Sequence, residues 1–95
     1  MNNYSKPSVN EFCVSGTVLA TQSENLNWND KNTGLARTGV RFSIILQGDY
    51  GIIFCRSFNP SENLVKVKVG DLVYLPIDKF DKENGMKVAI LNRGI

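Results

Sequence analysis

The sequence predicts a small all-β protein whose five strands close, or nearly close, into a barrel. β-branched and apolar residues recur in short runs with the two-residue period of strands, and turns rich in glycine, asparagine and aspartate separate these runs. Almost no segment shows the period of a helix. Because the chain has 95 residues, 42% of them hydrophobic, we expect a single domain over residues 1–95, with residues 1–11 as a flexible N-terminal tail.

The expected strands follow one another along the whole chain. In the first, Gly16 lies in the middle of an apolar run, and an internal strand glycine often marks a bulge or a sharp bend. Small barrels use such bends to turn a corner. The five strands are expected at Phe12–Thr21, Gly39–Gln47, Tyr50–Phe58, Leu72–Ile77 and Met86–Asn92.

The segments between the strands predict four connections. Gln22–Thr38 is polar and is expected to be a long hairpin loop. Gly48 and Asp49 lie between two apolar runs, which is typical of a two-residue hairpin turn. Asn59–Lys68 predicts a short helical turn or an irregular crossover between the third and fourth strands. Asp78–Gly85 is expected to be a charged loop.

The composition argues against catalysis. The chain has no histidine, which removes the commonest general base and the usual zinc ligand, and it shows no phosphate-binding, dinucleotide or metal-ligand motif. We therefore expect no enzyme activity, cofactor or metal site. Cys13 and Cys55 lie in apolar runs as small hydrophobes, which fits a reduced cytoplasmic protein; a disulfide between them is the alternative. No apolar run is long enough for a membrane helix.

The turn at Gly48 and Asp49 predicts which residues of the second and third strands face each other. Side chains alternate along a strand, so the pairs divide into two faces. The expected inner face pairs Ile44 with Ile53, Phe42 with Cys55, and Val40 with Ser57. The expected outer face pairs Ile45 with Ile52, Ser43 with Phe54, and Arg41 with Arg56, and places Gly39 beside Phe58.

The outer face is the main functional signal. Two arginines directly opposite each other repel, and exposed phenylalanines are costly, unless a ligand uses both. Single-stranded nucleic acid does so, because bases stack on aromatic rings while arginines meet phosphates. We therefore predict that Arg41, Phe54, Arg56 and Phe58 bind nucleic acid. The alternatives are a dimer interface and burial beneath another part of the chain.

Two loops are expected to border this face. The first carries Trp28, Lys31 and Arg37, and the last carries Lys79, Phe80 and Lys82, so each offers one aromatic ring among cations. We predict that these six residues also contact nucleic acid. Otherwise, Trp28 folds back on the barrel, and the lysines of the last loop are solvated beside its acidic residues. The net charge of +2 is only mildly basic.

The order of motifs resembles that of the OB-fold single-stranded DNA-binding proteins. It runs VSGTV, a long loop, GVRFSIIL, IIFCRSFNPSENL, KVGDLVYLPI and MKVAILNRGI. The resemblance implies a five-stranded OB-type barrel, with Phe54, Arg56 and Phe58 as residues that stack bases and contact the DNA backbone. The short crossover, and an end at Ile95 without a long acidic-tipped tail, are closer to the small dimeric proteins of phages and mobile elements than to the bacterial type.

The expected function is therefore sequence-tolerant binding of single-stranded DNA, which protects strands during replication or transfer of a phage or plasmid. The expected partners are single-stranded DNA and a second copy of the chain, in the cytoplasm of a bacterial host. Two alternatives stay open. One is an adaptor barrel that binds a protein of a replication or virion complex, and the other is an RNA-binding OB domain.

Overall fold

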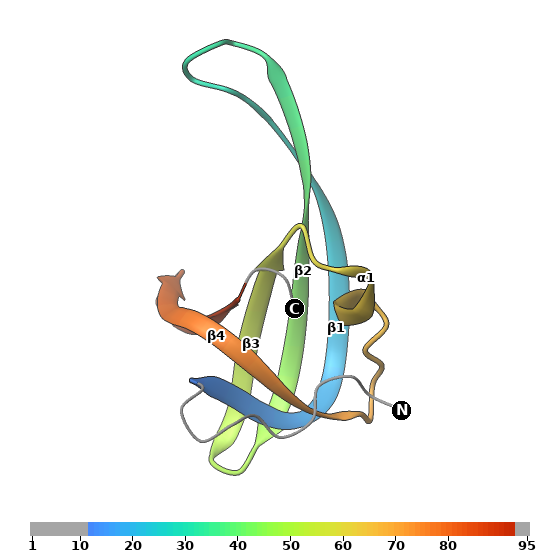
Figure 1. Ribbon diagram of the computed structural model, residues 1–95. Coiled ribbons are helices and arrows are strands. Elements are labelled where there is room, and N and C mark those ends of the chain that lie inside the picture. Colours follow the sequence, from blue (N-terminus) through green and yellow to red (C-terminus); the bar gives the residue numbers. More distant parts are fainter. Residues whose placement is uncertain (1–11, 93–95) are drawn as a thin grey trace.

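The computed structural model describes residues 12–92, which form five strands and one short helix (Figure 1). The strands are β1 (Cys13–Asn29), β2 (Ala36–Gly48), β3 (Gly51–Phe58), β4 (Leu72–Glu83) and β5 (Met86–Leu91), and α1 (Glu62–Val65) connects β3 to β4. They close in the order β1-β2-β3-β5-β4, with β3 parallel to β5 and the other neighbours antiparallel. This confirms the five-stranded OB-type barrel with a short crossover helix. The predicted tail, residues 1–11, lies outside the described residues.

Aliphatic side chains fill the barrel. Ile44 and Leu46 of β2 belong to one core cluster with Val73 and Leu75 of β4, and all four are fully buried. The crossover adds Leu64, which α1 inserts into the same cluster. α1 begins at Glu62 because the preceding Ser61 caps its first turn: the Ser61 hydroxyl accepts a hydrogen bond from the Leu64 N–H at 3.2 Å.

β1 turns the corner of the barrel. Its first residues, Cys13–Thr17, pair with β4, and from Thr17 onward it pairs with β2. A Cβ atom at Gly16 would lie 2.5 Å from the Gln47 carbonyl oxygen, so only glycine permits this approach of the two backbones. The bulge itself lies between Val18 and Ala20, past the glycine that predicted it.

The predicted loop Gln22–Thr38 is wrong, because most of it is strand. β1 continues to Asn29 and β2 begins at Ala36, so the β1–β2 ribbon projects beyond the barrel as an arm, at the top of Figure 1. We define the arm as residues 25–40, because β3 pairs with β2 only up to Arg41. None of the arm side chains is buried, so the arm has no apolar alternation that could have predicted it as strand.

The predicted charged loop Asp78–Gly85 is also mostly strand. β4 continues to Glu83 after a bulge between Ile77 and Lys79, and it pairs with β5 across a two-residue turn. The turn residues Asn84 and Gly85 have φ angles of 52° and 81°, the left-handed conformation that tight hairpins require.

The two cysteines are both free. Cys55 packs in the core as the small hydrophobe that its apolar run predicted, and burial raises the pKa of its thiol to about 12. A thiol with so high a pKa is almost entirely protonated at neutral pH and is a poor nucleophile.

Candidate nucleic-acid interface

The β2–β3 turn lies one residue later than predicted. Asp49 and Tyr50 are the turn residues, and Gly48 pairs with Gly51, whose φ angle of 130° suits glycine. Every cross-strand pair is therefore shifted by two residues from the predicted register. A two-residue shift keeps each side chain on its face, and the predicted inner and outer faces are those of the structure.

The shift corrects the predicted opposition of the two arginines. Arg41 lies opposite Phe58, and Arg56 lies opposite Ser43. Gly39 lies beyond the end of β3 and pairs with Leu26 of β1 instead of lying beside Phe58. The predicted repulsion between two directly opposed arginines is therefore absent and gives no support to a ligand on this face.

One outer face runs continuously over β1, β2 and β3. In the β1–β2 ladder Glu24 is opposite Arg41 and Trp28 is opposite Arg37, so alternation places both β1 residues on the side of Phe58. The arm thus extends the barrel face. We call this surface the aromatic face, and define it by Trp28, Arg37, Arg41, Phe54, Arg56 and Phe58.

The face carries three rings, Trp28 from β1 and Phe54 and Phe58 from β3, and their positions measured along β2 are evenly spaced. Trp28 lies at the level of Arg37, Phe58 at the level of Arg41, and Phe54 at the level of Ile45. Successive levels differ by four residues, which is about 13 Å along a strand at about 3.3 Å per residue. Trp28 and Phe58 are each about half exposed, at 49% and 48%, and Phe54 is partly buried. The result is a row of accessible rings that runs from the barrel into the arm.

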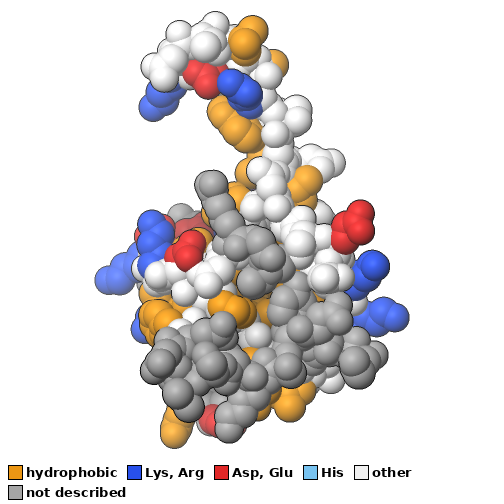
Figure 2. All heavy atoms as spheres, viewed as in Figure 1, with side chains coloured by type: hydrophobic (Ala, Val, Ile, Leu, Met, Phe, Trp, Pro, Cys, Tyr) orange, Lys and Arg blue, Asp and Glu red, His pale blue; other side chains and the backbone are white. Residues whose placement is uncertain are grey.

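Each arginine of the aromatic face has a carboxylate partner. Arg41 pairs with Glu24 across the strands, and Arg56 pairs with Glu83 from the end of β4. At the tip of the arm, Arg37 lies 3.6 Å from Asp30. Figure 2 shows basic side chains and an acidic one gathered at this tip. The cations on the face are thus balanced by carboxylates of the protein itself.

Trp28 is packed along the arm, not folded back on the barrel. A Cβ atom at Gly39 would lie 3.3 Å from Cη2 and Cζ3 of its indole, so the glycine leaves room for the ring. Asn59 lies beside the same glycine and joins the arm to the end of β3. Its side-chain oxygen accepts the Val40 N–H at 2.9 Å, and its own N–H donates to the Val40 carbonyl at 2.7 Å.

Asn59 was not among the predicted site residues, although an asparagine before a proline is a turn signal. It adopts a left-handed φ of 52°, which asparagine tolerates better than most residues.

Beside Asn59, a hollow of about 540 Å³ opens at the base of the arm. The hollow is lined by Asn25, Leu26, Asn27, Thr38, Gly39, Val40 and Asn59.

The structure separates the residues predicted in the last loop. Lys79 and Glu83 are four residues apart and so lie on the same side of β4, the outer side, where Glu83 forms an ion pair with Arg56. Phe80 and Lys82 therefore point to the opposite side. Phe80 packs edge-on against Phe12, with ring centroids 5.8 Å apart, and the Lys87 ammonium lies 4.1 Å from the centre of the Phe80 ring.

Lys31 lies in the turn at the tip of the arm and is exposed. Of the ten predicted site residues, six therefore form the aromatic face, and Lys79 lies on the outer side of β4, the side from which Glu83 reaches that face. Phe80 and Lys82 lie elsewhere.

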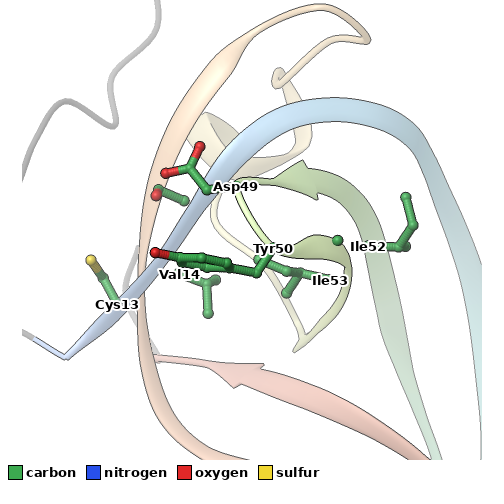
Figure 3. A pocket seen from close by; sticks show the side chains of 8 residues that line it. Cys13, Val14, Asp49, Tyr50, Ile52 and Ile53 are labelled. Carbon is green, nitrogen blue, oxygen red and sulfur yellow. The ribbon is translucent and has the colours of Figure 1, made fainter.

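A second hollow, of about 310 Å³, lies at the barrel end away from the arm. It is formed by the start of β1 and by the β2–β3 turn with the first residues of β3. Figure 3 shows the Tyr50 ring extending across it toward Val14 and Cys13. Tyr50 is fully exposed and was also missed, because its position as a turn residue depends on the corrected register.

Fold and face together define a class: a small OB-type barrel with a β-ribbon arm and an outward sheet face of aromatic and arginine side chains. Comparisons with protein-family models, curated proteins and solved structures gave no match. Within residues 12–92, no helix is long and apolar enough to cross a membrane, and no group of three or more acidic or cysteine side chains could hold a metal ion.

Proposed function

We propose that this protein binds single-stranded DNA on the aromatic face, with little dependence on sequence. The observation that carries the proposal is the row of three rings at four-residue intervals, with Arg37, Arg41 and Arg56 among them. Every base has a face that can stack on such a ring, so stacking is sequence-tolerant and contributes about 1–3 kcal/mol per base.

The position of the face supports this function. OB barrels bind oligonucleotides on the face of strands two and three, together with the loops between strands one and two and between strands four and five. Here the β1–β2 connection is the arm, which carries Trp28, Arg37 and Lys31. The β4–β5 hairpin brings Lys79 and Glu83 to the other border of the face. Arginines that contact phosphates would hold the strand while its bases stack on the rings.

The proposed biological role follows from the resemblance to small phage and mobile-element binding proteins. In that role a homodimer coats single strands during replication or transfer of a phage or plasmid, in the cytoplasm of the host cell. The same rings and cations would also accept RNA, and only contacts to the 2′-hydroxyl would distinguish the two.

One observation favours a different function. Because each arginine of the face is paired with a carboxylate, the face carries little free positive charge, while Phe58 and Trp28 stay exposed. A half-apolar, charge-balanced surface also suits a protein partner. The second candidate is therefore an adaptor that binds a protein of a replication or virion complex.

Titration with poly-dT separates the two candidates. Trp28 is the only tryptophan in the chain, so its fluorescence reports on the arm alone. We expect quenching that salt reverses, with a slope of log affinity against log salt near −3 if about four cations contact phosphates. The same titration with poly-rU and with duplex DNA tests strand type. Unchanged fluorescence together with no gel shift at low salt would leave the adaptor as the better account.

A further inference from the structure

We propose that Glu24 and Glu83 act as built-in competitors of single-stranded DNA, since they occupy the two arginines that its phosphates would bind. The inference rests on the proposed function and assigns a role to two acidic residues that the site prediction left out. Phosphates must displace both carboxylates, so these residues would keep the affinity for a strand low and release easy.

The Arg41–Glu24 pair is placed for such exchange. The two residues are directly opposite each other in the β1–β2 ladder, at the root of the arm and beside Phe58. Their side chains are 32% and 46% exposed, so water already reaches both groups. Ion pairs of this kind contribute little net stability. A phosphate that approaches Phe58 could therefore take the place of Glu24 at small cost.

The Arg56–Glu83 pair is more enclosed and leaves the arginine incompletely satisfied. Glu83 holds Nη1 of Arg56, while Nε is buried and has no hydrogen-bond partner among residues 12–92. A buried N–H without a partner is costly. A phosphate can bind two N–H groups of one guanidinium as a fork, which Glu83 does not do here. If Arg56 rotated toward a phosphate, the phosphate oxygens could accept hydrogen bonds from both Nε and an Nη group of its guanidinium.

Glu83 can leave without disturbing the core. It ends β4 next to the two-residue turn at Asn84 and Gly85, and it is only partly buried. Each displaced glutamate side chain would rotate out into the solvent, while its arginine binds a phosphate. The net charge of the face changes by one for each carboxylate removed, and glutamine in its place retains the size and a hydrogen-bond acceptor.

The test compares single-charge variants in binding to a fluorescent dT oligonucleotide over a series of salt concentrations. The variants are Glu24→Gln, Glu83→Gln and their combination. Glu62→Gln is the matched control, because Glu62 is an exposed glutamate on α1 that contributes to neither pair, and its loss changes the net charge equally. Thermal unfolding of each variant checks the fold.

We expect each face variant to bind about 2- to 5-fold more tightly than Glu62→Gln, with a salt slope steeper by up to about 0.7. Affinities equal to the control would overturn the inference, and so would weaker binding, which would mean that the glutamates position the arginines. Because Glu24 is well exposed, Glu24→Gln tests the inference even if Glu83→Gln unfolds. A protein that binds no dT at low salt in any form would instead refute the proposed function.

Discussion

The barrel and the arm share the strands β1 and β2 but are held together differently. Where β1 and β2 form the barrel, side chains such as Ile44 and Leu46 are fully buried. Where the same strands form the arm, none of the side chains from residue 25 to 40 is buried. The arm is held by ladder hydrogen bonds, by the Arg37–Asp30 pair and by Asn59 at its base.

The difference shows how one hairpin can provide both stability and a binding surface. A two-stranded ribbon without a core is marginally stable by itself, so we expect the arm to open locally without unfolding the barrel. Its side chains contribute little to packing and are available to a ligand. The four predictions that follow test this division between barrel and arm.

Substitution in the barrel core is expected to have the largest effect. Phe42 is 4% exposed and packs with the buried cluster, so Phe42→Ala should lower the free energy of unfolding by about 3–5 kcal/mol. Urea denaturation followed by circular dichroism measures this loss. A loss below about 1 kcal/mol would show that the core lies on the other face of β2.

Two glycine variants contrast the regions directly. In Gly16→Ala the new Cβ would meet the Gln47 backbone, so the barrel should lose about 1–3 kcal/mol of stability. In Gly34→Ala the new Cβ has open space, but the φ angle of 71° is strained for alanine by about 1–2 kcal/mol. That strain should disturb the arm tip alone. Equal losses in global unfolding would contradict the independence of the arm.

Removing the arm tryptophan should separate binding from folding. Trp28→Ala removes a half-exposed ring, so the free energy of unfolding should change by no more than about 0.5 kcal/mol. Affinity for oligo-dT should fall about 5- to 150-fold if one base stacks on the ring. Fluorescence anisotropy and urea denaturation on the same preparation measure both. Loss of the fold would show that the arm is part of the barrel's stability.

The smallest expected effect is that of acid on the arm tip. The Asp30 carboxylate accepts the N–H groups of Asn32 at 2.8 Å and Thr33 at 3.2 Å, and these bonds lower its pKa. Because the folded pKa lies below the unfolded value, the carboxylate orders the tip above about pH 4 and loses that effect as pH falls through the folded pKa. The NMR shifts of these two amides should titrate accordingly, and Asp30→Asn should abolish the transition. A midpoint above about pH 4 would contradict it.

The sequence predicted the elements that bury side chains. The inner faces of β2 and β3 and the barrel class followed from two-residue alternation, because burial on one face imposes that period. The arm and the end of β4 did not, since they are exposed on both faces and their strands are specified by pairing. Polar residues there were therefore interpreted as loops.

The candidate site was predicted in part for the same reason. Alternation correctly placed Phe54, Arg56 and Phe58 on the outer face, because the observed register differs from the predicted one by two residues and so keeps each side chain on its face. The sequence did not decide between turns at Gly48-Asp49 and Asp49-Tyr50, because both pairs lie between apolar runs, and this one-residue difference shifts the pairing register by two. Partners that depend on exact register, such as Glu24 opposite Arg41, could be found only from the structure.

The most direct test of the aromatic face is the binding of oligo-dT to Phe58→Ala, with the stability of the same sample measured alongside. Val69→Ala is the control, because Val69 is a more exposed apolar residue in the loop before β4, away from the face. We predict that Phe58→Ala binds about 5- to 150-fold more weakly while both variants keep the stability of the parent protein. Unchanged affinity in a folded Phe58→Ala would contradict the account.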